Sequence, residues 1–467
     1  MSLPDTRHRW QLAPHTFWAD ERTLVGGDPF RSLRLTDRGA TFVASVLDGA
    51  REPAGEAERS LLDRLLRGNL VVCPTLAAVD ANAAVTLVIP ARSDAASVQA
   101  VLDSAPQIPA IVVDDGSPIP LAGALTHPAG LQVIRHEESR GPSAARNAGA
   151  QACTTPWIAF ADADLAAPTG WIEKLLAYAD GTAAVAPRIV TANGMGLAAR
   201  FERAVCALDR GTTPGFIHPA GSLSYVPSAA LLISREALVA LHGFDESMPV
   251  GEDVDLVWRA AGRGVYYEPS VIVGHQPRSS LPASLRRRAA YGESSSALAG
   301  KHPALMHHGS FPLAAALPWI LLALGRPRTS VAASAAHLAL APRSMAQIPR
   351  AAAIRAAGTG QLRTALGLSR LLTRPLLPVT AAALAGGSGR TRLRVLALAL
   401  GGVVAERAVR KVPVNGESVA WQVADDAAYS LGVWRAALST RRPQVLLPRF
   451  RWGKPKPTSP QPGAVRT

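Results

Sequence analysis

The stretch Trp157-Ile158-Ala159-Phe160-Ala161-Asp162-Ala163-Asp164-Leu165 decides the fold of this chain. Its first four residues are apolar and form a run typical of a short buried strand. Asp162 and Asp164 follow where that strand should end, and ligands of open α/β sheets lie beyond the carboxyl ends of the strands. Alternate residues of an extended segment share a face, so both carboxylates should point to the same side. Such a pair suits Mg²⁺ or Mn²⁺ held jointly with a diphosphate.

A helix entry is a second interpretation of the same two carboxylates. Asp is a favourable N-cap residue, and Pro168 lies where a first helical turn could begin. Two carboxylates at this spacing are a weak motif by themselves. The motifs elsewhere in the chain therefore have to decide between the two interpretations.

Length and cysteine content limit the possible classes of protein. The chain has 467 residues, which corresponds to about three domains. Its three cysteines, Cys73, Cys153 and Cys206, have no C-x-x-C spacing and cannot form a disulfide framework, so we expect a reducing compartment. The first 20 residues are polar, and we expect no secretory signal peptide there.

Positive charge is concentrated in the C-terminal part of the chain. Residues 276–467 contain 27 Lys and Arg but 5 Asp and Glu, whereas the remainder contains 22 basic and 30 acidic residues. This asymmetry predicts a polyanionic partner, either nucleic acid or an anionic membrane surface. The basic part lacks the interleaved aromatic residues that stack on bases, so we expect the membrane surface and no nucleic acid.

Residues 1–80 are predicted to form a small α+β domain. Residues 30–35 alternate apolar and polar side chains, as a half-exposed strand does, and Thr36 is placed to cap a helix. A second helix is predicted over 57–66, ending at Gly68, and residues 70–73 could return as a strand. This winged-helix-like pattern, with its Leu35-Thr36-Asp37-Arg38-Gly39 turn, resembles the PqqD-like peptide-recognition domains. A structural cap without a ligand is the alternative.

An Ala-rich linker, 77–84, precedes residues 85–300, where strands and helices alternate. Residues 85–90, 111–113 and 131–134 are apolar runs typical of buried parallel strands, and a helical stretch lies between the first two. Strand–helix–strand alternation predicts an α/β domain with a Rossmann-like, mostly parallel sheet and right-handed crossovers.

Five motifs of this segment occur in an order that resembles a known family. They are Val88-Ile89-Pro90-Ala91-Arg92, Val113-Asp114-Asp115-Gly116-Ser117, Arg140-Gly141-Pro142-Ser143-Ala144-Ala145-Arg146-Asn147-Ala148-Gly149, Asp162-Ala163-Asp164 and Gly251-Glu252-Asp253-Val254-Asp255-Leu256. The set resembles the family-2 glycosyltransferases, which have the GT-A fold. The resemblance implies a UDP-hexose donor and transfer of the sugar with inversion.

The resemblance assigns the nucleotide to the first strand end, Ala91 and Arg92, and to Asp115 of the D-D-G-S turn. A carboxylate at a strand end can accept hydrogen bonds from a base imide or a ribose hydroxyl. An ordinary turn would explain the same four residues. Arg140 stands in a loop that enters a predicted helix and could approach the donor diphosphate, whereas Arg146 and Asn147 are expected to brace the pocket.

The resemblance also implies the catalytic pair and the metal ligands. In the family the Asp of the E-D pair is the base, which assigns Asp253, beside Glu252. The acceptor hydroxyl must lose a proton as it attacks, and a carboxylate can take that proton. Asp253 could also cap the predicted helix. The metal, Mg²⁺ or Mn²⁺, is assigned to Asp164 and His275, with Asp162 on the ribose side of the nucleotide or on the metal; a structural role is the alternative for His275.

The C-terminal part, 301–450, is predicted to be helical, apolar and basic. None of its apolar runs reaches the roughly 20 residues that a membrane span needs. Arginines recur near helical spacing, which favours amphipathic helices on an anionic surface, with one or two marginal spans as an alternative. Residues 286–288 form a basic segment that in relatives lies near the donor diphosphate, or else a solvated helix face. Residues 451–467 are predicted to be disordered.

The whole-chain layout is similar to the glycosyltransferases of mycofactocin systems. That similarity implies a peptide-derived redox cofactor as acceptor, glucose as the sugar, and a location at the cytoplasmic face of the cell membrane. A cell-envelope transferase that adds rhamnose or galactofuranose to a lipid-linked acceptor is one alternative. A peptide-binding membrane scaffold with an inactive core is another, although the intact carboxylate set argues against it.

Overall fold

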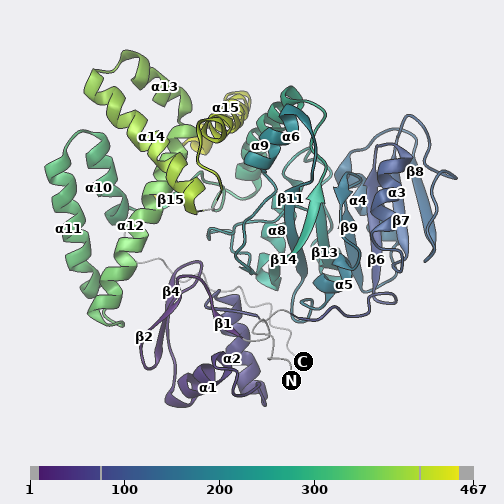
Figure 1. The fold of residues 1–467 in the computed structure, drawn as a ribbon, viewed down its shortest axis with the longest axis horizontal. Helices are drawn as coiled ribbons and strands as arrows, with labels where there is room; N and C mark the ends of the chain where they lie inside the picture. The colour runs from purple at the N-terminus through teal and green to yellow at the C-terminus, as the bar shows by residue number, and fades with distance from the viewer. Residues whose placement is uncertain (1–9, 74–75, 410–411, 452–467) are drawn as a thin grey trace. The chain divides into compact units, whose positions relative to one another are not determined.

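The computed structural model describes residues 10–73, 76–409 and 412–451 (Figure 1). The chain forms two compact units, one of residues 1–195 and 206–277 and one of residues 196–205 and 278–467. The first unit contains the N-terminal α+β domain and a large sheet, and the second is mainly helical. The sequence places residues up to 300 with the sheet, whereas residues 278–300 belong to the helical unit because α9 packs along α15 there.

The N-terminal domain has a three-stranded antiparallel sheet and two helices. The sheet order is β2-β3-β4, and a two-stranded ladder joins β1 to β5. Thr36 caps α1 by accepting a hydrogen bond from the Gly39 N–H, and α2 ends at Gly68, as predicted. The bounds are β1 (Gln11–Leu12), β2 (Phe17–Asp20), β3 (Thr23–Gly26), β4 (Arg31–Arg34), α1 (Asp37–Leu47), α2 (Glu56–Arg67) and β5 (Val71–Val72).

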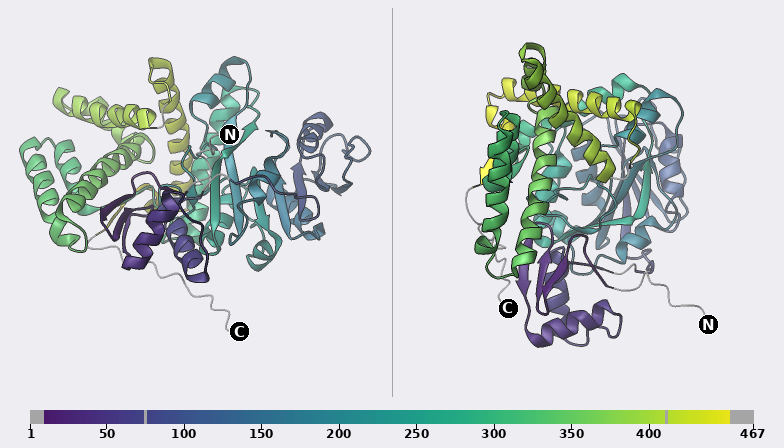
Figure 2. Two further views of the ribbon diagram at one scale, coloured as in Figure 1. Left: turned by 60° about the horizontal axis from the view of Figure 1, so that its bottom comes forward. Right: turned by 60° about the vertical axis from the view of Figure 1, so that its left-hand side comes forward.

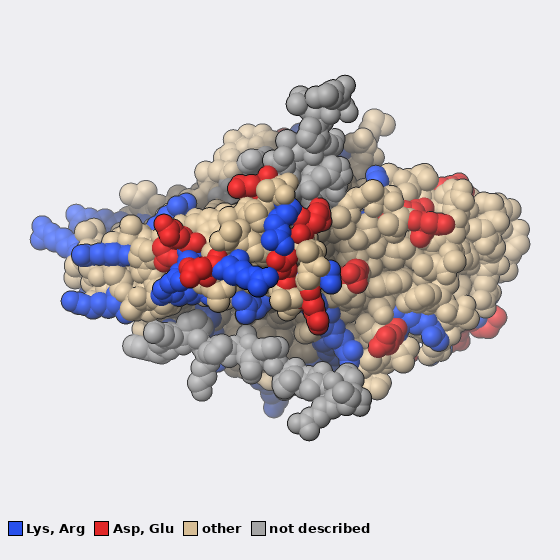
Figure 3. Space-filling model, turned by 90° about the horizontal axis from the view of Figure 1, so that it is seen from below, with Lys and Arg blue, Asp and Glu red and all other residues tan. Residues whose placement is uncertain are grey.

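The two helices of this domain bury apolar side chains against its sheet. Leu24 of β3 packs in one cluster with Val43 of α1 and Leu65 of α2, and these three side chains have no exposed surface. The two helices and the sheet are seen from two further directions in Figure 2 (purple). The surface seen from below carries interspersed acidic and basic side chains (Figure 3), and α2 contributes both signs of charge.

The central sheet of the first unit is mixed and mostly parallel, which confirms the predicted α/β core. Its order is β10-β14-β11-β13-β9-β6-β7-β8, and β12 pairs with β14. The longest strand of this sheet is β14, with 11 residues. The bounds are β6 (Val85–Ala91), β7 (Ala110–Asp115), β8 (Leu131–His136), β9 (Trp157–Ala161), β10 (Leu165–Ala166), β11 (Ala184–Thr191), β12 (Gly215–Phe216), β13 (Ala230–Ser234) and β14 (Val265–His275).

Helices cover both faces of this sheet. Leu87 of β6 packs with the side chains of α3 and α5, and its neighbour Val88 packs in the opposite cluster with those of α4, α7 and α8. This division follows from the strand period, because successive side chains point to opposite faces. The helices are α3 (Ala95–Asp103), α4 (Pro142–Ala152), α5 (Trp171–Leu176), α7 (Arg235–Ala240) and α8 (Glu252–Ala260), with a 3₁₀ turn η2 (Ala261–Arg263).

Strand direction brings the predicted site residues to one edge of the sheet. Strands β6, β7, β8 and β9 are parallel neighbours. Strand β13 is antiparallel to both β9 and β11, and β14 is parallel to β11, so β14 runs in the direction of β9. The carboxyl ends of β6, β7, β9 and β14 therefore meet at the edge where ligands of such sheets bind.

The second unit is built around two closely packed helices, α9 and α15. A Cβ added to Gly432 would lie 1.8 Å from the Ala289 carbonyl oxygen, and one added to Gly292 would lie 2.2 Å from that of Tyr429. Small residues therefore allow the two backbones to touch. Arg288 of α9 forms an ion pair with Asp425 of α15 at 2.8 Å, and Arg374 pairs with Asp426 at 2.8 Å.

The elements of this unit are α6 (Gly196–Ala204), α9 (Leu281–Lys301), α10 (Leu313–Ala323), α11 (Pro327–Ser344), α12 (Arg350–Thr373), α13 (Leu377–Gly386), α14 (Gly389–Val409), α15 (Gly416–Ser439) and η3 (Pro443–Leu446), with strands β15 (Ser310–Pro312) and β16 (Arg449–Arg451). Among the helices of the described residues, none combines the length and the apolar character of a membrane span. The predicted disorder over 452–467 lies outside the described residues.

Candidate active site

The Asp162 turn lies directly beyond β9 and does not begin a helix. The Asp162 N–H donates to the Ala229 carbonyl at 2.8 Å, and the chain enters β10 after Asp164. Helix α5 starts later, with Gly170 as its N-cap, so the helix-entry interpretation of the two carboxylates is wrong. Strand β10 pairs with β14 so that Leu165 faces His275. This register brings His275 Nε2 to 2.9 Å from Asp164 Oδ2.

Arg146 joins this turn to α8, the helix that begins with Glu252 and Asp253. Its side chain is 4% exposed, and its guanidinium donates to Asp162 Oδ1 at 2.7 Å and to Glu252 Oε1 at 3.0 Å. The same guanidinium lies over the Phe244 ring, 5.3 Å from its centroid. Burial alone would lower the pKa of Arg146, but Asp162 and Glu252 outweigh that effect and raise it. Arg146 is therefore a permanent cation between the two carboxylates.

Glu252 and Asp253 open α8, directly after Gly251, whose φ of 89° lies in the left-handed region. Glu252 is 7% exposed and bound to Arg146. Asp253 is only half-buried, and it interacts electrostatically with Arg146. The two residues of the predicted catalytic pair thus differ: Glu252 is held inside the protein, and Asp253 is accessible from outside.

Asp115 fixes the loop that leads into α4. Its Oδ1 accepts hydrogen bonds from His136 Nδ1 at 2.8 Å and the Arg140 N–H at 2.9 Å. Its Oδ2 accepts from Ser139 Oγ at 2.7 Å and the Gly141 N–H at 2.9 Å. Burial alone would raise the pKa of Asp115, but these hydrogen bonds lower it. The carboxylate therefore shapes the loop around Arg140 as well as ending β7.

The other predicted nucleotide-binding residues lie at the same edge with fewer contacts. Ala91 is buried at the end of β6, and Arg92 after it is exposed. Arg140 is 59% exposed, and its Nη2 lies 3.5 Å from Glu246 Oε2. Asp162, Glu252 and Asp253 thus lie around Arg146. Asp164 is paired with His275. Asp115 and Arg140 form a separate group.

Asn147 extends the connection made by its neighbour Arg146. Its amide donates to the Phe244 carbonyl at 2.9 Å and accepts from the Phe244 N–H at 2.9 Å. Gly243 makes room for this side chain, because a Cβ there would lie 2.6 Å from Asn147 Oδ1. The bracing role predicted for Arg146 and Asn147 thus has specific partners. His136 was not singled out in the sequence, although it stands at the end of a predicted strand beside Asp115.

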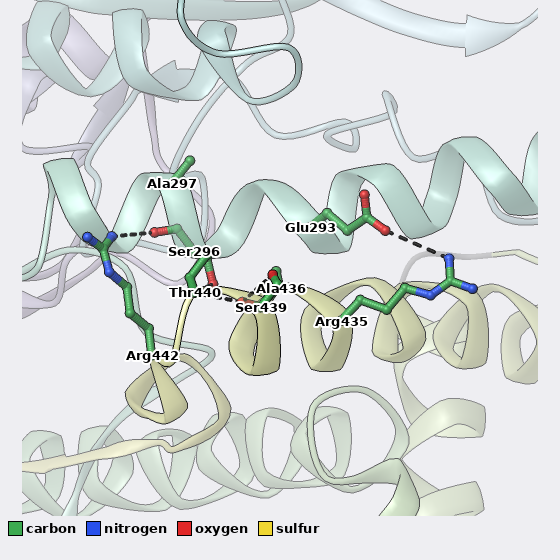
Figure 4. Close-up of a pocket in the computed structure, with 8 residues that line it drawn as sticks. All are labelled: Glu293, Ser296, Ala297, Arg435, Ala436, Ser439, Thr440 and Arg442. Atoms are coloured by element: carbon green, nitrogen blue, oxygen red, sulfur yellow. Dashed lines mark hydrogen bonds and ion pairs between the residues drawn. The ribbon is translucent and has the colours of Figure 1, made fainter.

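A pocket of about 540 Å³ in the second unit contains none of these residues (Figure 4). It lies between α9 and the C-terminal end of α15. Arg442 donates to the Ser296 carbonyl at 2.9 Å, and Arg435 Nη1 lies 3.8 Å from Glu293 Oε1. These contacts hold α15 against α9. Nearby on α9, Arg288 pairs with Asp425, so part of the predicted donor-side basic segment serves the packing of this unit.

A carboxylate cluster at the carboxyl edge of a mostly parallel α/β sheet is the setting expected for a sugar transferase, and the comparisons agree. Residues 86–240 match the model of glycosyl transferase family 2. The pre-mycofactocin glycosyltransferase of Mycobacterium tuberculosis (strain ATCC 25618 / H37Rv) is 33% identical over 456 residues, which cover 92% of this chain and 95% of that protein. The chain therefore belongs to glycosyl transferase family 2, in the group of mycofactocin-system glycosyltransferases.

Two other similar proteins share less with this chain. The succinoglycan biosynthesis protein ExoU of Rhizobium meliloti (strain 1021) is 32% identical over 171 residues, 34% of this chain and 50% of that protein. A solved structure, the mannosyltransferase PcManGT from Pyrobaculum calidifontis in complex with GDP-Man and Mn²⁺, is 19% identical and has a TM-score of 0.35. That match covers 68% of this chain and 86% of the mannosyltransferase chain.

Because Arg146 is bound to both Asp162 and Glu252, Arg146→Gln is expected to lower the free energy of unfolding strongly. Breaking a buried ion pair from one side costs about 3–5 kcal/mol, because Glu252 stays buried without its cation. Urea unfolding at neutral pH measures the loss. Arg22→Gln, which breaks the exposed pair with Asp37, is the control; equal losses for the two variants at neutral pH would contradict this account.

Proposed function

We propose that this chain is a metal-dependent, inverting GT-A glycosyltransferase that moves a hexose, glucose, from a UDP-sugar to a peptide-derived redox cofactor of the mycofactocin type. The observation that carries the proposal is the cluster of Asp162, Asp164, Glu252 and Asp253 at the carboxyl edge of the sheet. The named relatives act on pre-mycofactocin, which supports the choice of acceptor.

The charge balance of the cluster favours a divalent cation. Arg146 supplies one positive charge against Asp162, Glu252 and Asp253. The pairing of Asp164 with His275 offers an oxygen and a nitrogen ligand. Within the described ranges, no three His, Cys, Asp or Glu side chains are grouped as an ion site. This fits Mg²⁺ or Mn²⁺, which in such enzymes use one or two protein ligands and complete their coordination with substrate phosphates. The ion would neutralise the charge that develops on the leaving diphosphate.

The donor nucleotide would occupy the strand ends on the other side of the cluster. Ala91 and Arg92 end one strand, and the adjacent strand ends at Asp115. Because the protein's own donors already occupy both oxygens of Asp115, we assign this residue to shaping the base and ribose pocket through the loop at 136–141. The exposed Arg140 can turn from Glu246 to the diphosphate.

Asp253 is the proposed base. The acceptor oxygen attacks the anomeric carbon from the side opposite to UDP, the bond from that carbon to the diphosphate oxygen breaks, and the acceptor proton passes to Asp253. A single displacement inverts the configuration. Asp253 is half-buried and accessible, whereas Glu252 is bound to Arg146, so the second residue of the pair takes the proton.

The N-terminal domain is proposed to hold the peptide part of the acceptor. Strands β2 and β4 are the edges of its sheet and pair only with β3 in the part of the chain that the structure describes. An extended peptide can add a strand to such an edge. A lipid-linked envelope acceptor remains the rival choice, and offering both acceptors to the enzyme distinguishes them.

Asp253→Asn is expected to abolish transfer from UDP-glucose while UDP affinity stays within a few-fold of wild type, because an amide cannot take the proton. Turnover by product formation and UDP binding by calorimetry measure the two effects. Asp245→Asn is a control from the preceding loop, where Asp245 accepts hydrogen bonds from Ser247. An Asp253→Asn enzyme that keeps a tenth of wild-type turnover would remove Asp253 from the role of base.

We also propose that helices α10–α14 bind an anionic membrane surface at the cytoplasmic face. Residues 313–409 contain 12 Arg and a single acidic residue, Glu406. Large apolar side chains are exposed among them, including Val331, Leu362 and Leu393. Exposed Arg390 and Arg392 closely precede Leu393 in sequence, a combination suited to lipid headgroups above an apolar layer.

The charge-reversing double variant Arg390→Glu/Arg392→Glu is therefore expected to weaken binding to anionic vesicles at least about tenfold, since each arginine contributes about 1 kcal/mol near such a surface. Flotation with phosphatidylglycerol-containing and purely zwitterionic vesicles measures it, and high salt should weaken wild-type binding. Arg441→Glu, outside these helices, is the control. Equal wild-type binding to both kinds of vesicle would contradict the electrostatic part of the proposal.

A further inference from the structure

The N-terminal domain is hydrogen-bonded to one segment of the catalytic core, residues 216–229. Asp28, in the turn between β3 and β4, accepts hydrogen bonds from the Ser222 N–H at 2.8 Å and from Ser222 Oγ at 2.5 Å. Asn69 is 9% exposed, and its amide donates to the Phe216 carbonyl at 2.9 Å and accepts from the Phe216 N–H at 2.7 Å. Asn69 also donates to the Asp28 carbonyl at 3.0 Å, so the two residues that bind this segment are hydrogen-bonded to each other.

The same segment contacts both halves of the proposed active site. Its Ser224 carbonyl accepts a hydrogen bond from Trp258 Nε1 of α8 at 2.9 Å. Its last residue, Ala229, accepts the hydrogen bond of the Asp162 N–H at 2.8 Å. Val226 between them is fully buried, in one cluster with Leu256 of α8. The segment therefore lies between the N-terminal domain, the helix of Asp253 and the Asp162 turn.

The segment has no helix and no strand between β12 and β13, and it includes the small residues Ala220 and Gly221. Its own hydrogen bonds close a turn, from the Gly221 N–H to the His218 carbonyl at 2.7 Å and from the His218 N–H to the Leu223 carbonyl at 3.1 Å. An irregular segment of this kind keeps one conformation only when contacts from outside offset its conformational entropy. Asp28 provides such contacts in the middle of the segment, at the exposed Ser222.

We propose that Asp28 is a positioning residue for the transferase reaction: through residues 216–229 it fixes α8, and with it Asp253, relative to the Asp162 turn. This inference rests on the proposed function and extends it, because it makes the N-terminal domain part of the catalytic geometry as well as an acceptor-binding domain. Small displacements of reacting groups are enough to slow a reaction, so a contact outside the site can act on turnover.

The kinetics of Asp28→Ala in the full-length protein test the proposal, because a positioning role and an acceptor-docking role affect different constants. Loss of positioning should lower kcat about tenfold for both transfer and UDP-sugar hydrolysis, with the KM for the donor little changed. A domain that only docks the acceptor would instead raise the KM for the acceptor. Asp28→Asn should recover part of the loss because its amide oxygen still accepts from Ser222. Asp37→Ala is the matched control, since Asp37 is an exposed residue of the same domain paired with Arg22.

Hydrogen exchange gives a readout that does not depend on turnover. In Asp28→Ala, amide exchange should rise at 222–224 and in α8, and not in β6 or β7. A rise confined to 222–224, or a kcat equal to that of Asp37→Ala, would overturn the positioning role. A wild-type protein without UDP-sugar turnover would overturn the proposed function instead, and the exchange result would still decide whether Asp28 holds α8.

Discussion

The guanidinium of Arg146 between Asp162 and Glu252 is the interaction on which the rest of the site depends. Taking such charges out of water costs several kcal/mol for each ion, and only short, well-directed contacts offset that cost. These contacts join residues of α4, the turn after β9 and the first turn of α8. The turn with the proposed metal ligand and the helix with the proposed base therefore cannot shift independently.

A second carboxylate, Asp115, organises the donor side in the same way, and α4 connects the two groups. The Gly141 N–H at the start of α4 is bound to Asp115, and Arg146 follows a little more than one turn later. Helix α4 therefore fixes the loop around Arg140 relative to the carboxylates around Arg146. With residues 216–229 tied to α8 and to Asp162, the site is held from two directions.

Much of this arrangement could be predicted from local sequence, because apolar runs mark the buried strands and the carboxylates follow them directly. Ala91 and Asp115 end their strands and Asp162 directly follows β9, close to where the sequence places these strand ends. The partners of Arg146 could not be predicted, since Glu252 is 106 residues away and only tertiary packing brings it near. The same holds for Asp28 and Ser222, 194 residues apart. The boundary at 277 was missed because the basic start of α9 resembles a donor-side segment, while its packing partner, α15, lies far along the chain.

The claim that this carboxylate cluster binds a nucleotide diphosphate through a divalent cation is tested most directly by calorimetric titration of UDP into the wild type and Asp164→Ala, each with and without Mn²⁺. Asp164 lies 2.9 Å from His275 and outside the Arg146 ion pairs, so its removal should leave the cluster folded. The account predicts that Mn²⁺ strengthens UDP binding to the wild type at least about tenfold, or about 1.4 kcal/mol, and does so far less in Asp164→Ala. Equal UDP affinity of the wild type with and without Mn²⁺ would contradict it.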